Sequence, residues 1–182
     1  MSNLTDQTDI IRIFKSAKDA AIFTLASLAL ICCSQAILAE DIHGKIVTVQ
    51  DGDTVTVQER STLLSHRIRL AGIDAPEKGQ RFGEDSKKNL ELRVLGQDVV
   101  VQTYKTDRYG RRVGVVLSKG QDVNLEQVEN GLAWHYKAYE HEQPPADRNR
   151  YATAEIVARG AKRGLWRDNA PVTPWEWRKQ QK

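Results

Sequence analysis

Five charged residues in three short motifs carry the side chains that metal-assisted cleavage of a phosphodiester requires. They are Asp53, Arg69, Asp74, Glu77 and Arg111. Carboxylates can hold a hard divalent cation and position a water molecule. Guanidinium groups grip a phosphate and match the charge that builds on its oxygens in the transition state. The residue types therefore favour phosphoryl chemistry over other reactions.

Each motif has a structural interpretation when it is taken alone. Asp51-Gly52-Asp53 is a common hairpin turn. Arg69 can be a surface residue of a strand, and Arg111 can be a charge beside a tight turn. Pro76, between Asp74 and Glu77, fixes the backbone so that both carboxylates can face one point. The functional interpretation depends on the joint pattern.

The segments around these residues predict strands in the first half of the chain and helices after them. Strand-like, β-branched segments occupy residues 42–49, 54–57, 63–73, 99–104 and 113–117. Helical patterns occupy residues 84–95 and 123–130 and the stretch from after Asp147 to near Arg163. This order fits a small Greek-key barrel of the OB type, although periodicity does not choose it over other α+β arrangements.

The three motifs, in this order, resemble those of the staphylococcal (micrococcal) nuclease family, also called the thermonuclease family. The similarity spans roughly residues 42–166. It implies an α+β fold, a five-stranded OB-type Greek-key β-barrel with about three helices, over a nuclease domain at residues 40–167. It also implies a single bound Ca²⁺ as cofactor.

The resemblance assigns a role to each matching position. The implied metal ligands are Asp53, Asp74 and the backbone carbonyl of Ala75. The implied catalytic residues are Glu77, which orients or deprotonates the attacking water, and the phosphate clamps Arg69 and Arg111. The best-known member of the family has threonine at the position of Ala75, but a carbonyl ligand survives that difference.

Substrate contacts are implied for Arg108, Tyr109 and Tyr139. Aromatic stacking on a base tolerates any sequence, which suits a nuclease of broad specificity. For Tyr136 and Tyr139 an alternative stays open, namely packing against the last helix.

The resemblance implies a secreted, Ca²⁺-dependent, nonspecific nuclease that hydrolyses DNA and RNA to 3′-phosphate products. No dedicated protein partner is implied, and a monomer is expected. Two alternatives stay open: a catalytically inactive OB-fold module that binds nucleic acid, and a membrane-anchored form of the nuclease. The formal net charge of +3 decides none of these, because so small an excess does not by itself indicate a nucleic-acid partner.

Residues 1–39 have the organisation of a signal peptide or an N-terminal membrane anchor. Basic residues come first, residues 20–39 contain no charge, and small residues occur at Ala36 and Ala39. The uncharged run is about long enough to cross a bilayer, so a membrane tether through residues 20–39 competes with cleavage. The sequence predicts a secreted or periplasmic protein.

The C-terminal segment, residues 168–182, is predicted to be a partly disordered or loosely docked tail. It contains two of the four tryptophans, Trp175 and Trp177. No function is predicted for it.

Overall fold

The computed structural model describes residues 41–181, and the strands of its first half close on themselves. The predicted signal peptide or membrane anchor, residues 1–39, lies outside the described residues. Within residues 41–181, no helix combines the length and the apolar character that crossing a membrane requires.

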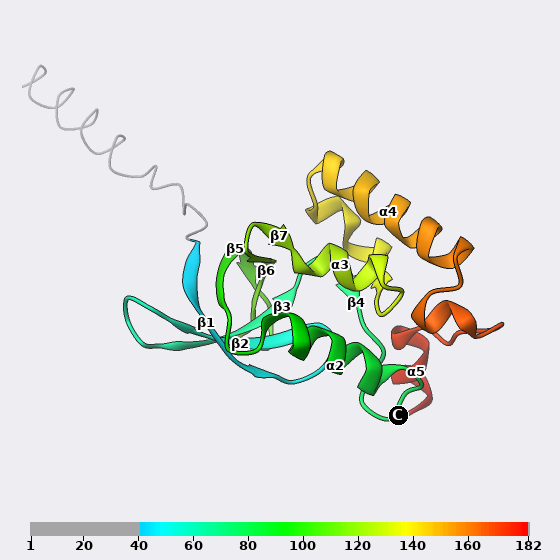
Figure 1. Cartoon of the computed structure of the whole chain (residues 1–182), viewed down its shortest axis with the longest axis horizontal. Coiled ribbons are helices and arrows are strands. Elements are labelled where there is room, and N and C mark those ends of the chain that lie inside the picture. The colour runs from blue at the N-terminus through cyan, green and yellow to red at the C-terminus, as the bar shows by residue number, and fades with distance from the viewer. Residues whose placement is uncertain (1–40, 182) are drawn as a thin grey trace, which may run out of the picture. The chain divides into compact units, whose positions relative to one another are not determined.

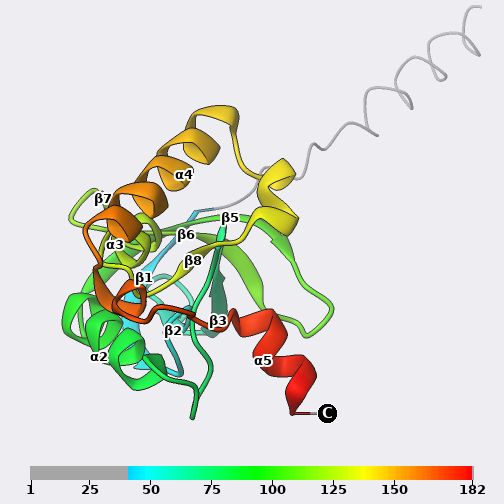
Figure 2. The ribbon, with the colours of Figure 1, turned by 90° about the vertical axis from the view of Figure 1, so that its right-hand side faces the viewer.

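Five strands form a closed barrel (Figures 1 and 2). They are β1 (Ile42–Val49), β2 (Thr54–Glu59), β3 (Ser65–Leu70), β5 (Asp98–Thr106) and β6 (Arg112–Ser118). Neighbours in the order β3-β2-β1-β5-β6 pair antiparallel, and β3 pairs in parallel with β6 to close the ring. A short strand β7 (Gln121–Asp122) turns back and pairs antiparallel with the end of β6. This architecture confirms the predicted OB-type α+β fold.

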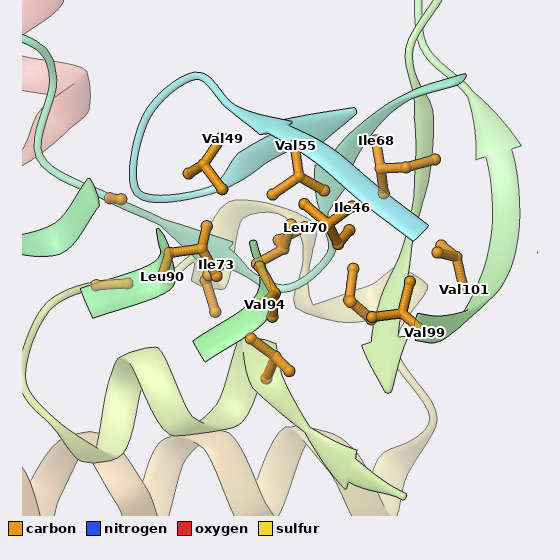
Figure 3. Close-up of a cluster of buried hydrophobic side chains, with 14 of the residues drawn as sticks. Ile46, Val49, Val55, Ile68, Leu70, Ile73, Leu90, Val94, Val99 and Val101 are labelled. Atoms are coloured by element: carbon orange, nitrogen blue, oxygen red, sulfur yellow. The ribbon is translucent and has the colours of Figure 1, made fainter. Parts of the chain in front are cut away.

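Alternating apolar residues of the strands fill the barrel (Figure 3). Ile46, Val55, Ile68 and Val101 are each fully buried, and side chains of the first helix pack against the same cluster. Each buried aliphatic side chain of this size contributes about 1.5–3 kcal/mol relative to an exposed one. Because side chains alternate along a strand, the positions between these buried residues face outward and can carry polar residues such as Arg69.

Helices cover the barrel in the predicted order. They are α2 (Gly83–Val94), α3 (Val123–Glu129) and α4 (Pro145–Gly160), joined by the 3₁₀ helices η1 (Lys137–Glu142) and η2 (Gly164–Arg167). Figures 1 and 2 show α3 between the barrel and α4. Tyr151 of α4 fixes this contact, because its hydroxyl donates to both oxygens of Asp122, the residue that caps α3.

The strand predicted over residues 63–73 is interrupted at Gly72. Its φ of +75° is left-handed, and a Cβ there would lie 2.1 Å from Nε2 of Gln143. The chain then resumes as β4 (Ile73–Asp74), which pairs with β8 (Trp134–His135) instead of extending β3. This break redirects Asp74 away from the line of the barrel strand.

The C-terminal segment forms a helix, α5 (Pro174–Gln180), so the prediction of a partly disordered or loosely docked tail is corrected. Thr173 and Glu176 cap its first turn reciprocally, which satisfies backbone donors that would otherwise lack partners. Trp175 stacks on Tyr136 with ring centroids 5.6 Å apart and meets Trp134 edge-on at 5.7 Å. These contacts dock α5 on the folded domain.

Candidate active site

A single cleft of about 580 Å³ gathers every residue that the sequence analysis singled out. Its lining includes Asp53, Arg69, Asp74, Ala75, Glu77, Arg108, Tyr109, Arg111 and Tyr139. These residues come from the β1–β2 loop, the end of β3, the β4–α2 connection, the β5–β6 turn and η1. The fold thus brings together positions that lie far apart along the chain.

Arg69 joins the two aspartates at the floor of the cleft. Its Nη2 lies 2.9 Å from Oδ1 of Asp74 and 3.2 Å from Oδ2 of Asp53. The backbone N–H of Ala75 also donates to Oδ2 of Asp53, at 2.7 Å. Both carboxylates are buried. Two negatively charged groups are therefore held side by side in a region of low solvent access.

Helix α3 fixes the loop that carries Asp53. Gln127 is fully buried and donates to the carbonyl of Gly52 at 2.8 Å. Space is tight at this point, since a Cβ on Gly52 would lie 1.9 Å from Oγ of Ser86. The N–H of Asp53 donates to Oδ1 of Asp51 at 3.0 Å, which closes the turn. The position of Asp53 follows from these constraints.

The same helix fixes the start of the loop that carries Asp74. Asn124, which is fully buried, donates to the carbonyls of Ala71 (3.0 Å) and Gly114 (3.1 Å). Its Oδ1 accepts from the N–H of Val116 at 3.1 Å. One side chain thereby ties the end of β3 to β6. Both aspartate loops are anchored on α3.

Burial and mutual repulsion perturb the acidic groups of the floor. Burial, followed by the charge of Asp53, raises the pKa of Asp51 to about 6. Burial also raises the pKa of Asp74, although hydrogen bonding to Arg178 and the charge of Arg69 act in the opposite direction. Carboxylates with raised pKa values gain from a nearby cation. The floor of the cleft is thus suited to bind positive charge.

Glu77 lies at the rim of the floor, next to the aspartates. Its backbone N–H donates to Oε1 of Gln80 at 3.0 Å, and its carboxylate pairs with Nη1 of Arg178 at 2.5 Å. The side chain is 35% exposed, so solvent water can reach it. That exposure is compatible with a group that takes a proton from water.

The second predicted arginine, Arg111, stands on the β5–β6 side of the cleft. Its Nε donates to Oδ2 of Asp107 at 2.8 Å, and its guanidinium lies 5.7 Å from the ring of Tyr109. Arg108 lies 4.9 Å from the same ring, which is 66% exposed. Arg111 is thus paired with Asp107, and the described residues show no hydrogen bond from it to Asp53 or Asp74.

Tyr139 lines the cleft and leaves its ring accessible. It is 47% exposed, with Nζ of Lys105 at 5.3 Å from its centroid and Tyr136 at 5.2 Å. Tyr136 instead packs on Trp175 of α5. The packing partner of Tyr136 thus lies in α5, whereas the predicted alternative was packing against the helix now seen as α4.

The donor atoms of the floor fit a hard divalent cation. Among residues 41–181 no group of three or more His, Cys, Asp or Glu side chains is arranged to hold a metal. A calcium site needs no such group, because carbonyls and waters complete an oxygen shell started by two carboxylates. Asp53, Asp74 and the carbonyl of Ala75 supply only oxygen, which suits a hard cation rather than a softer metal.

Among the lining residues that were not predicted, two bear directly on the acidic floor of the cleft. Asp51 was interpreted only as a turn residue, yet it lines the cleft and its pKa is raised. Arg178 comes from α5 and bonds Asp74 and Glu77. The two aspartates on either side of Gly52 could have indicated that Asp51, like Asp53, lies in the cleft. No local pattern indicates Arg178, which is separated from Asp74 by 104 residues.

The barrel and its cleft define a class: small OB-type proteins with a cleft built from carboxylates and arginines. Comparison with known proteins identifies the family. The sequence model of the staphylococcal nuclease homologue family matches residues 67–168. This chain therefore belongs to the staphylococcal nuclease family, and it is a nuclease, a hydrolase that acts on nucleic acids.

Similar proteins agree with this assignment. A protein named as an endonuclease in Haemophilus influenzae is 41% identical over 138 residues, which is 76% of this chain and 74% of the relative. One with the same name in Escherichia coli O157:H7 is 41% identical over 152 residues, covering 83% of this chain and 94% of the relative. The micrococcal nuclease of Shigella flexneri is 38% identical over 152 residues, covering 78% and 83%.

Proposed function

We propose that this protein is a Ca²⁺-dependent nuclease that hydrolyses both DNA and RNA and leaves 3′-phosphate products. The observation that carries the proposal is the pairing of Arg69 with Asp53 and Asp74 on the floor of the cleft. A cation-binding carboxylate pair and a phosphate-binding guanidinium lie there in direct contact. Glu77 stands beside them, within the same cleft.

Asp53, Asp74 and the carbonyl of Ala75 would hold the calcium ion. When bound, the ion supplies positive charge for the phosphate oxygens. Glu77 accepts the proton of the attacking water as its oxygen bonds to phosphorus; the P–O5′ bond breaks, and the leaving 5′-oxygen takes up a proton from solvent. The partial exposure of Glu77 supports that role, since water can reach the carboxylate.

Arg69 and Arg111 stabilise the charge that develops on the phosphate. The planar fork of a guanidinium matches two phosphate oxygens at once, which an ammonium does not. Arg111 acts through its charge and not as a proton donor, because guanidinium gives up its proton only at very high pH. Its ion pair with Asp107 holds it at the cleft wall.

The wall of the cleft supports broad specificity. Tyr109 and Tyr139 offer exposed aromatic rings, and Arg108 lies against the first of them. Stacking on such rings accepts any base. Cleavage of both DNA and RNA with little preference for sequence is therefore expected.

The test is hydrolysis by the purified protein of one DNA and one RNA oligonucleotide in Ca²⁺, in Mg²⁺ and in EGTA. The proposal predicts cleavage of both substrates in Ca²⁺ alone, with 3′-phosphate ends identified by mass spectrometry. Cleavage in EGTA, or 5′-phosphate ends, would contradict it. Binding of DNA without any hydrolysis would favour the inactive binding module instead.

We also propose that residues 1–39 direct export, so that the nuclease acts outside the cytoplasm. A nonspecific nuclease in the cytoplasm would attack the nucleic acids of its own cell, which supports this proposal. N-terminal sequencing of the exported protein tests it. A new N-terminus near Ala36 or Ala39 is expected for a secreted form, and an intact N-terminus in the membrane fraction would identify an anchored one.

A further inference from the structure

Helix α5 brings one residue of the C-terminal segment into the candidate active site. The segment lies beyond residues 67–168, the part that matches the family, so its contacts are not implied by that match. The segment just before α5 is held by Gln80, whose Nε2 donates to the carbonyl of Val172 at 2.7 Å. Oε1 of the same Gln80 accepts from the N–H of Glu77. The tail is thus tied directly to the loop that carries Glu77.

Arg178 of α5 binds both carboxylates of that loop. Its Nη2 lies 2.8 Å from Oδ2 of Asp74, and its Nη1 lies 3.2 Å from Oδ1 of the same residue. Nη1 also lies 2.5 Å from Oε1 of Glu77. The guanidinium therefore binds both oxygens of Asp74 and also contacts Glu77. Paired, planar contacts of this kind are among the stronger interactions between side chains.

These contacts use the atoms that a bound cation would use. Asp74 is 1% exposed, so its oxygens have few routes to other partners, and Arg69 already donates to Oδ1. A divalent cation on the same carboxylate would meet the positive charge of Arg178 at very short range. Like charges at such a distance, with little water between them, repel strongly. Arg178 and the cation cannot both keep their best contacts with Asp74.

We propose that Arg178 is a further residue of this active site, which competes with the divalent cation for Asp74 and Glu77. Binding of the cation displaces Arg178 from these carboxylates, and Arg178 thereby sets the affinity of the site for the cation. The displacement also frees the Glu77 carboxylate to accept a proton. This inference rests on the cation site of the proposed function.

The anchoring of α5 makes the displacement local. Trp175 packs on Tyr136 and Trp134, and Gln80 holds the segment before the helix, by contacts that do not involve Arg178. The Arg178 side chain itself is 42% exposed, so it can turn toward solvent while the helix remains docked. The chain then keeps a guanidinium beside the cleft after the cation has entered.

Calcium binding by isothermal titration calorimetry tests the proposal without any measurement of activity. The comparison is between the full protein, Arg178→Gln and the control Lys179→Gln. Lys179 is exposed and lies on the same helix, so its substitution makes the same change of net charge without touching the cleft. We expect Arg178→Gln to lower the Kd for Ca²⁺ by about three- to tenfold. The cation then no longer has to break a partly exposed ion pair in order to bind. Lys179→Gln should stay within about twofold of wild type, because a single exposed charge has little effect at this distance.

A second readout uses the unchanged protein. The guanidinium NMR signal of Arg178, assigned through bonds from its own backbone amide, should move toward the position of a free arginine as Ca²⁺ is added. This measurement keeps the proposal testable if Arg178→Gln does not fold, which far-UV circular dichroism would reveal.

The outcomes separate this inference from the proposed function. A Kd that is unchanged or higher in Arg178→Gln, with Ca²⁺ binding intact in wild type, overturns the competition and leaves the cation site standing. An Arg178 signal that does not move at saturating Ca²⁺ does the same. If neither wild type nor Arg178→Gln binds Ca²⁺, the cation site of the proposed function fails, and the inference fails with it.

Discussion

At the scale of single residues, Arg69 organises the floor of the cleft, because one nitrogen contacts both Asp53 and Asp74. It projects from the outer face of β3, where alternation with the buried Ile68 and Leu70 leaves room for a charged side chain. The strand pattern alone predicted that face. The contact with two aspartates depends on loops that the pattern does not describe.

Substitution of Arg69 by lysine should lower kcat by about 10²–10³-fold, the usual loss when a preorganised transition-state donor is removed. Lysine keeps the charge but cannot contact two carboxylates and a phosphate with one planar group. Steady-state DNA hydrolysis measures the effect. Arg67→Lys, on the exposed part of the same strand, is the matched control and should retain wild-type kcat. Equal activity of the two variants would remove Arg69 from the mechanism.

Asp51 makes stability depend on pH. Because burial and Asp53 raise its pKa from 3.8 to about 6, the native state holds this proton at pH values where the unfolded chain has lost it. The contribution of Asp51 to the free energy of unfolding is therefore fully present below about pH 4 and is lost as the pH rises through about 6. Asparagine at this position does not titrate and keeps an acceptor for the N–H of Asp53.

In EGTA, Asp51→Asn should exceed wild type in free energy of unfolding by about 1–3 kcal/mol at pH 7. The difference should shrink toward zero near pH 4, which urea unfolding at the two pH values would measure. Asp41→Asn, at an exposed position, should show no such trend. A difference that does not change with pH would argue against the raised pKa.

At the scale of elements, helix α3 holds the loops that carry the two aspartates of the site. Its residues Asn124 and Gln127 hold the two aspartate loops, and Tyr151 of α4 holds its cap. The sequence predicted α3 and α4 from their apolar spacing. It did not predict the buried amides, since polar residues on a short helix are equally compatible with a solvent-exposed face.

Asn124→Ala should lower the free energy of unfolding by about 3–5 kcal/mol, because three hydrogen bonds to buried backbone groups are lost. Thermal or urea unfolding measures it. Asn130→Ala, at the exposed end of the same helix, should cost far less. A loss below about 1 kcal/mol for Asn124→Ala would mean that water replaces the amide, since buried groups left unpaired cost more than that.

The C-terminal element shows what a local pattern could have revealed. Thr173-Pro174-Trp175-Glu176 has the spacing of a capping box, with proline at the first helical position, and it does start α5. That signal was available in the sequence. The contact of Arg178 with Asp74 was not, because it depends on where the barrel places β4 relative to α5.

At the scale of the whole molecule, the strand order and the family motifs predicted the barrel, whereas its closure follows from the pairing of β3 with β6. The net charge of +3 gives no guide to function. Function instead follows from how a few charges are placed around one cleft. The strand predicted over residues 63–73 is confirmed at residues 65–70 and broken at Gly72, whose left-handed backbone packs so closely on Gln143 that a Cβ would not fit.

Binding of Ca²⁺ to the folded state alone should stabilise the whole domain. At a free concentration 100 times its Kd, the gain in free energy of unfolding is about 2.7 kcal/mol, and Tm should rise by several degrees. Differential scanning calorimetry with Ca²⁺ and with EGTA measures the shift. Asp53→Ala, which lacks one implied ligand, should lose it. An equal Tm for wild type in both buffers would speak against a calcium site.

The measurement that tests the central claim most directly compares release of acid-soluble nucleotides from DNA, in Ca²⁺, by wild type, Glu77→Gln and Glu84→Gln. Glu84 lies close by in sequence on the exposed start of α2, so it matches the change of charge. The account predicts that Glu77→Gln loses about 10²–10⁴-fold in kcat as a general base would, while Glu84→Gln retains wild-type activity. Hydrolysis by Glu77→Gln at the wild-type rate would contradict the assignment of this cleft as the catalytic site.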